Sequence, residues 1–249
     1  MEKLIVLILI VISLAGCTAS NISQTQTTNT PQQQSTIMEK INFTTSDDWA
    51  IVANYYPSSG NAVILLHQLG SDKSSYISFA NELNRNGYAV LALDSRGHGE
   101  STIRNGKKVV WQSFSDLDFL NMTKDVSAAR DWLTNKGHNS FAIIGASVGA
   151  NIALNYGVSD SAVKTVILLS PGLEHKGIVT NQTIRNFAKP IFIVASNEDT
   201  YSARSSAILY ENAQGKKEIK LFDNAGHGTN MFARTDLDRL TLNWLKNNL

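Results

Sequence analysis

The chain has 249 residues, of which 43% are hydrophobic and 17% are charged. This composition is ordinary for a globular protein and is sufficient for one sizeable core. The formal net charge is only +1, and the sequence has no long run of Lys or Arg. Nothing therefore points to a nucleic-acid partner or to adsorption on an anionic membrane surface, and we expect small or neutral partners.

The first 16 residues have the features of a secretory signal peptide. Lys3 precedes an apolar run from Leu4 to Ile12, which is too short to favour a membrane-spanning helix. Leu14 to Cys17 resembles the lipobox of prokaryotic lipoproteins, which implies cleavage before Cys17 and lipidation of this only cysteine. The alternative is an uncleaved anchor, or an ordinary signal with a chance cysteine. Both interpretations place the folded part outside the cytoplasm, and lipidation anchors it to the cell membrane.

Residues 17–38 are expected to form the lipidated cysteine and a disordered tether. From residue 18 to residue 36, all but three residues are Ser, Thr, Asn or Gln, and this composition cannot bury apolar area. The folded domain is then expected over residues 39–249. It has no cysteine, so we expect no internal disulfide.

The expected elements begin with two strands, 39–45 and 49–57, on either side of the turn-like residues 46–48. They predict an antiparallel hairpin at a sheet edge. The pattern then changes to near-continuous apolar runs that alternate with helical stretches, as expected for strands buried on both faces. These strands are 61–67, 88–94, 140–145, 164–170, 189–196 and 217–223. The expected helices are 73–86 and 119–136, with others starting at Val148, Ser202 and Met231.

This alternation predicts an α/β fold. We expect a mostly parallel sheet of roughly eight strands, with helices on both faces and right-handed crossovers. Functional sites in such sheets lie beyond the carboxyl ends of the strands.

The segment Gly145-Ala146-Ser147-Val148-Gly149 matches the pattern G-x-S-x-G between an expected strand and an expected helix. In a nucleophile elbow, the strained serine projects from the sheet, and small residues two positions away avoid the crossing strand and helix. The helix amino terminus also favours developing negative charge. The alternative is a tight turn with a capping serine, but the strand and helix context favours a catalytic nucleophile at Ser147.

A serine hydroxyl needs a base, and the base needs a group that orients it and stabilises its charged form. Asp199 follows the strand 189–196, and His227 follows the strand 217–223 between two glycines. Ser147, Asp199 and His227 thus each lie just beyond a different strand, in the Ser, acid, His order of one hydrolase class. Glu198 adjoins Asp199 and is the alternative acid.

These segments resemble the α/β-hydrolase superfamily of serine hydrolases over residues 39–249. ALDSRGHGES, residues 92–101, resembles the D-x-R-G-H-G-x-S loop of that family, and LLHQLGSD, residues 65–72, resembles its oxyanion segment. The chain is most similar to small esterases and dienelactone-hydrolase-like proteins. Dienelactone hydrolase has a cysteine nucleophile where this chain has Ser147, which favours ordinary ester hydrolysis.

The resemblance implies an oxyanion hole formed by the backbone N–H groups of Leu69 and Val148. Gln68 stands where family members often have Gly. Residues 171–189 fall where the family carries its insertions, and this short segment predicts a small helix or loop and a minimal lid. No spacing of His, Asp and Glu resembles a metal site, and no G-x-G-x-x-G opens a helix, so we expect no metal and no cofactor.

The activity implied is cleavage of small-molecule carboxylic esters through an acyl-enzyme intermediate. A peptidase or thioesterase with the same triad is one alternative, and a non-catalytic, surface-anchored binding protein is another. The other titratable side chains receive structural roles: His67 in the oxyanion loop, His98 in the loop before the nucleophile, His138 and His175 in surface loops, and Asp94, Asp125 and Asp131 in loops or helices. Four aromatic side chains in or near loops are candidates for the pocket lining and, equally, for the core: Trp111, Phe114, Phe187 and Tyr201.

Overall fold

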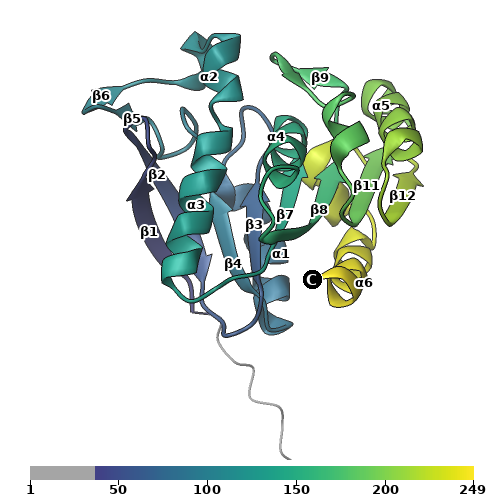
Figure 1. The fold of residues 1–249 in the computed structure, drawn as a ribbon, viewed down its shortest axis with the longest axis horizontal. Coiled ribbons are helices and arrows are strands. Elements are labelled where there is room, and N and C mark those ends of the chain that lie inside the picture. The colour runs from purple at the N-terminus through teal and green to yellow at the C-terminus, as the bar shows by residue number, and fades with distance from the viewer. Residues whose placement is uncertain (1–36) are drawn as a thin grey trace, which may run out of the picture. The chain divides into compact units, whose positions relative to one another are not determined.

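The computed structural model describes residues 37–249, in which a central sheet lies between two layers of helices (Figure 1). The expected signal peptide, Cys17 and the tether up to residue 36 lie outside the described residues. The longer strands are β1 (Glu39–Thr44), β2 (Trp49–Tyr56), β3 (Ala62–Leu66), β4 (Ala89–Leu93), β7 (Phe141–Ala146), β8 (Val163–Leu169), β11 (Ile191–Ser196) and β12 (Lys217–Phe222). Two-residue strands are β5 (Ile103–Arg104), β6 (Lys107–Lys108), β9 (Glu174–His175) and β10 (Ile178–Val179).

The sheet runs in the order β1-β2-β4-β3-β7-β8-β11-β12. The short strand β5 also pairs with β2, and β6 pairs with β5. β1 and β2 form the predicted antiparallel hairpin, and β2 is also antiparallel to β4. Every pair from β4 to β12 is parallel. The predicted α/β fold, with a mostly parallel sheet of about eight strands, is confirmed. Because the strands from β4 to β12 run the same way, their carboxyl ends meet at one edge.

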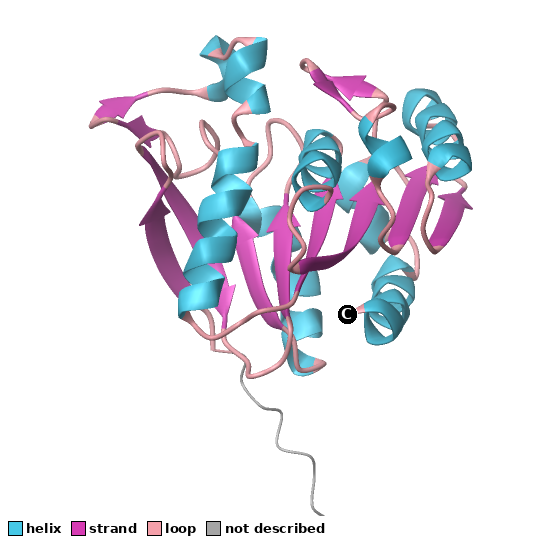
Figure 2. Cartoon of the chain, viewed as in Figure 1, coloured by secondary structure: helices cyan, strands magenta, loops and turns pink. Residues whose placement is uncertain are grey.

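Helices cover both faces of the sheet (Figures 1 and 2). The α-helices are α1 (Ile77–Arg85), α2 (Asp116–Leu120), α3 (Thr123–Asn135), α4 (Val148–Gly157), α5 (Thr200–Asn212) and α6 (Leu237–Asn248). The 3-10 helices are η1 (Lys73–Tyr76), η2 (Trp111–Ser113), η3 (Thr183–Asn186) and η4 (Gly228–Ala233). Within residues 37–249, no helix has both the length and the apolar character needed to span a bilayer.

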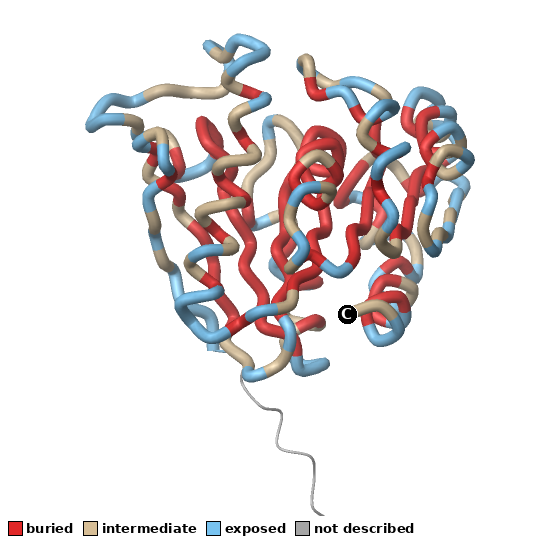
Figure 3. The backbone as a smooth tube through the Cα atoms, in the orientation of Figure 1, coloured by how far each residue is buried: buried red, intermediate tan, exposed pale blue. Residues whose placement is uncertain are grey.

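The apolar core has two halves, one on each face of the sheet. Alternate residues of β3 point to opposite faces: Ile64 packs with α3 and α4, whereas Leu65 packs with α1 and α6. The central strands β3, β4, β7 and β11 are buried along their whole length (Figure 3). This burial explains why their sequences are continuous apolar runs instead of alternating patterns.

The expected helix 73–86 begins as η1, the helix expected from Ser202 begins at Thr200, and two further helices differ more from the expectation. The predicted helix 119–136 is two helices, because Ser115 and Asp118 form a capping box that starts α2 earlier and the chain bends at Asn121 before α3. The last helix does not start at Met231. That residue belongs to η4, and α6 begins at Leu237.

Arg96 anchors the loop after β4 through two carboxylates. Its guanidinium donates to Asp47 at 2.8 and 3.0 Å and to Asp125 at 2.8 Å, and the Arg96 backbone N–H donates to Asp125 at 2.9 Å. Burial alone would raise the pKa of Asp47, but hydrogen bonds from Arg96 and Thr45 lower it to about 2. These ionic contacts tie the β1–β2 turn and α3 to the loop 94–101, and they explain why a buried Arg96 is tolerated.

We predict that Asp47→Asn weakens the fold in a pH-dependent way. The depressed pKa of Asp47 contributes stability above the unfolded value of 3.8, and this contribution is lost as the pH falls from about 4 to about 2. The substitution should therefore cost about 1 kcal/mol at neutral pH, allowing for solvent screening, and much less at pH 2.5. Urea unfolding across this range measures it, with Asp131→Asn, an exposed aspartate of α3, as the control. A cost that does not change with pH would contradict the assignment.

Candidate active site

Ser147 lies at the sharp turn between β7 and α4. Its backbone has φ 54° and ψ −118°, a conformation that a non-glycine residue rarely adopts, and its N–H donates to the Leu169 carbonyl at 2.8 Å. A Cβ atom at Gly145 would lie 2.1 Å from the Gly149 carbonyl oxygen, and one at Gly149 would lie 2.6 Å from the Leu66 carbonyl oxygen. Only glycine therefore fits at both positions, as the elbow pattern requires.

Asp199 and His227 come together at the carboxyl edge of the sheet. Asp199 follows β11 at the start of α5, His227 follows β12 at the start of η4, and the Asp199 Oδ2 to His227 Nδ1 distance is 2.6 Å. A Cβ atom at Gly228 would lie 3.3 Å from the Ala146 Cβ. The residue after His227 thus packs against the residue before Ser147, and all three predicted triad residues gather at this edge.

The His67 side chain orders the expected oxyanion segment. Its Nε2 accepts a hydrogen bond from the Ser95 N–H at 3.0 Å, so the proton lies on Nδ1, which donates to the Gln68 carbonyl at 2.8 Å. Burial lowers the pKa of His67 and keeps the ring neutral. Among residues 37–249, the backbone N–H groups of Leu69 and Val148 have no hydrogen-bond partner. These are the two donors that the sequence resemblance assigns to the oxyanion hole.

A family profile described as serine aminopeptidase S33 matches residues 57–186, which is 130 of the 249 residues. The chain belongs to this family. It is a hydrolase of the serine-dependent class, with the α/β-hydrolase fold that the sequence predicted. No curated protein sequence matches the chain.

Solved structures are similar to this S33-family hydrolase in fold. An esterase of Pyrococcus furiosus has a TM-score of 0.71 and 18% identity, covering 88% of this chain and 93% of its own. A dienelactone hydrolase of Anabaena variabilis has a TM-score of 0.66 and 16% identity, covering 86% and 99%. An esterase of Exiguobacterium antarcticum has a TM-score of 0.67 and 15% identity, covering 84% and 100%.

Glu198, the alternative acid, makes different contacts in this hydrolase. It accepts hydrogen bonds from the Asn224 N–H at 2.8 Å, the Gly226 N–H at 2.7 Å and the Ser196 hydroxyl at 2.5 Å. The Ser196 hydroxyl and the Gly226 N–H hold the pKa of Glu198 at about 2. The Glu198 carboxylate therefore holds the loop that leads into His227, while Asp199 contacts the His227 ring. The sequence identified Asp199 and Glu198 as the two candidate acids. It did not predict that Glu198 would bind the backbone of the loop before His227.

Two other histidines are not surface residues, contrary to the expectation. His138 is 7% exposed and lies between the Tyr55 hydroxyl, at 3.3 Å, and the Gly60 carbonyl, at 3.0 Å. His175 is half-buried on the β9–β10 hairpin, edge-on to Tyr201, and burial lowers its pKa. His98 is buried and stacks on Trp111, with a pKa lowered to about 4 mainly by burial. The stacked, neutral His98 fits its predicted structural role.

The segment between β8 and β11 is small. It contains only the β9–β10 hairpin and η3, as a minimal lid requires, although the hairpin itself was not predicted. Of the four aromatic residues proposed for a pocket, Phe187 is 1% exposed and belongs to the core, whereas Tyr201 is exposed beside the hairpin.

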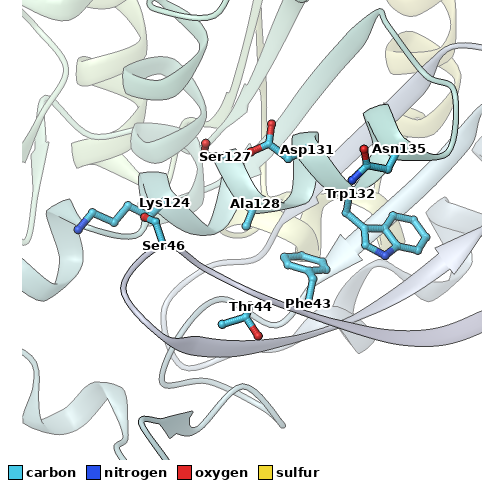
Figure 4. Close-up of a pocket in the computed structure, with 9 residues that line it drawn as sticks. All are labelled: Phe43, Thr44, Ser46, Lys124, Ser127, Ala128, Asp131, Trp132 and Asn135. Atoms are coloured by element: carbon cyan, nitrogen blue, oxygen red, sulfur yellow. The ribbon is translucent and has the colours of Figure 1, made fainter.

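Two cavities lie outside the triad. One, of about 320 Å³, adjoins the oxyanion segment and is lined by Gly70, Ser71, His98, Trp111 and neighbouring residues. The other, of about 250 Å³, lies between β1 and α3 and is bordered by Phe43, Lys124 and Trp132 (Figure 4). Within the described part of the chain, no three His, Cys, Asp or Glu side chains cluster in a way that could hold a metal ion.

We predict that Glu198→Ala loosens the loop before His227. Two backbone N–H groups lose their acceptor, so the amide hydrogens of Asn224 and Gly226 should exchange with solvent roughly fivefold to tenfold faster. Hydrogen exchange followed by mass spectrometry or NMR measures the change. Glu174→Ala, on the exposed hairpin, is the matched control. Unchanged exchange in Glu198→Ala would show that its carboxylate does not hold this loop.

Proposed function

We propose that the chain hydrolyses carboxylic esters through an acyl-enzyme intermediate, with Ser147 as nucleophile, His227 as base and Asp199 as the orienting acid. The observation that carries this proposal is the 2.6 Å contact between Asp199 and His227, next to a serine held in a strained elbow. Backbone N–H groups of Leu69 and Val148 serve as the oxyanion donors. The proposal also rests on the family, whose members are serine hydrolases.

The reaction follows from these positions. Asp199 accepts a hydrogen bond from the Nδ1–H of His227, which leaves Nε2 as the basic nitrogen. Nε2 takes the Ser147 hydroxyl proton as Oγ attacks the ester carbonyl, and the carbonyl oxygen becomes an anion held by the two backbone donors. The imidazolium then returns the proton to the leaving alkoxide, and the C–O bond breaks. Water repeats the cycle on the acyl-enzyme, which releases the acid and restores Ser147.

Small esters are the proposed substrates. The β9–β10 hairpin and η3 are the only elements inserted between β8 and β11, so this segment carries no large lid of the kind that gates lipases. The solved structures that resemble this fold include two esterases, which is consistent with such a substrate. The family description names a serine aminopeptidase, and this favours amide hydrolysis as the second function to test.

We predict that Ser147→Ala and His227→Ala each lower kcat/KM for p-nitrophenyl acetate and butyrate by about 1000-fold or more. The double variant should lose little beyond either single variant, because the two residues act as one unit. Fluorophosphonate labelling of the full-length chain should fail in Ser147→Ala. Ser161→Ala, an exposed serine before β8, is the control.

Each result has a clear meaning. Ester turnover that survives in Ser147→Ala would refute the nucleophile. A folded, unsubstituted chain that cleaves aminoacyl p-nitroanilides but not p-nitrophenyl esters would favour the peptidase. A folded chain that neither labels nor turns over any of these substrates would favour the non-catalytic binding protein.

The location of the enzyme is also a proposal. The lipobox-like sequence ending at Cys17 supports an enzyme attached by lipid to the outer side of the cell membrane. We predict that, in a bacterial host, Cys17→Ser moves the chain from the membrane fraction to the soluble fraction and abolishes incorporation of an alkyne fatty acid. The unsubstituted chain should retain both properties. Labelling that persists in Cys17→Ser would contradict lipidation at this residue.

A further inference from the structure

We propose that Gln68 is a positioning residue that locks the oxyanion segment to the loop of His227. Its side chain makes the two loops, which supply different parts of the catalytic machinery, behave as one unit. This inference rests on the proposed function, because it assigns Gln68 a role in that reaction.

The peptide group between Gln68 and Leu69 is held at its carbonyl end. The Gln68 carbonyl accepts hydrogen bonds from His67 Nδ1 at 2.8 Å and from the Ser71 N–H at 3.2 Å. A trans peptide is planar, so its C=O and N–H point in opposite directions. Holding the Gln68 oxygen therefore sets the direction of the Leu69 N–H, the proposed oxyanion donor. The backbone of Gln68 is thus one anchor of the oxyanion segment.

The Gln68 side chain extends from the same residue to the histidine loop. Its Oε1 accepts two hydrogen bonds from Thr229, one from the backbone N–H at 3.1 Å and one from the hydroxyl at 3.0 Å. Thr229 is 7% exposed and lies two residues after His227. These contacts join residues 161 positions apart in the sequence. One amide oxygen thus links the oxyanion segment directly to the second residue after the base.

The histidine loop is shaped around this amide. Gly228 has φ +57°, and a Cβ atom at this position would lie 2.7 Å from Gln68 Oε1. Its N–H donates to the Ser170 hydroxyl at 3.0 Å, which fixes the same stretch from the β8 side. Any side chain at position 228 would displace the Gln68 amide. Gly228 is therefore required by the bridge as well as by its backbone conformation.

The bridge matters because both loops must be in place at the same moment. Attack by Ser147 needs His227 to receive a proton and the Leu69 N–H to stabilise the oxyanion, and a displacement of about 1 Å can cost about 100-fold in rate. A glycine at position 68, which the family often has, lacks any side chain for such a bridge. Loss of the hydrogen bonds between Gln68 and Thr229 should lower the rate of the chemical step and leave substrate binding largely unchanged.

The test compares the full-length chain with Gln68→Met, which keeps the size of the side chain but removes the acceptor. We expect kcat for p-nitrophenyl butyrate to fall between about 10-fold and 100-fold, with KM within about twofold. Thr229→Val removes only the hydroxyl donor and should cause a smaller fall, whereas Thr229→Ser keeps both donors and should restore near-normal kcat. The double variant Gln68→Met/Thr229→Val should be no slower than Gln68→Met alone, because both changes break the same bridge.

Controls separate positioning from a general loss of structure. Gln214→Met makes the same substitution at an exposed glutamine before β12, and kcat should not change. The Thr229 amide hydrogen should exchange faster in Gln68→Met and at the normal rate in Gln214→Met. Far-UV circular dichroism and the unfolding midpoint show whether each variant is folded. If Gln68→Met fails to fold, the Thr229→Val and Thr229→Ser pair provides the same comparison.

Two failures remain distinguishable. If the unsubstituted chain neither labels with fluorophosphonate nor turns over ester, the proposed function is wrong and the catalytic role of Gln68 falls with it. If the unsubstituted chain is active but Gln68→Met keeps kcat within twofold, or the losses in Gln68→Met and Thr229→Val simply add, the positioning role alone is wrong.

Discussion

The site depends on the backbone of Ser147, which is held at φ 54° where β7 meets α4. A positive φ at a non-glycine residue costs on the order of 1–3 kcal/mol, and the surrounding strands and helix must supply it. Gly145 and Gly149 allow this crossing because no Cβ atom fits at either position. The Ser147 N–H is also fixed by the Leu169 carbonyl of β8. The position of Ser147, the proposed nucleophile, is therefore a property of the central sheet and not of a free loop.

The other site residues are positioned by contacts between loops at the same edge. Glu198 and Ser196 hold the chain before His227, and Ser170 and Gln68 hold the chain after it. The loop after β4, anchored by Arg96, supports His67 through the Ser95 N–H. Each loop thus receives its conformation from a neighbour that follows a different strand. This arrangement keeps the partly buried histidine loop in place without a large lid.

Much of the fold could be predicted because the parallel strands are buried on both faces, which makes their sequences continuous apolar runs. The elbow could be predicted because only glycine fits at the two positions that lie two residues before and two residues after Ser147. The contacts of Glu198 and Gln68 could not, because each joins segments far apart in the chain and neither side chain has a distinctive local pattern. The one sequence signal for the Gln68 contact was that Gln68 stands where family members often have glycine. His138 was misplaced because its partners, Tyr55 near the end of β2 and Gly60 in the loop before β3, lie far from it in the sequence.

The most direct test of Ser147 as the nucleophile is peptide mapping of the full-length chain after rapid acid quenching during turnover of p-nitrophenyl butyrate. We expect a butyryl group on the peptide that contains Ser147, located on that serine by fragmentation, which disappears as substrate is exhausted. A butyryl group on another residue, or turnover without any acylated peptide at the earliest times, would contradict an acyl-enzyme at Ser147.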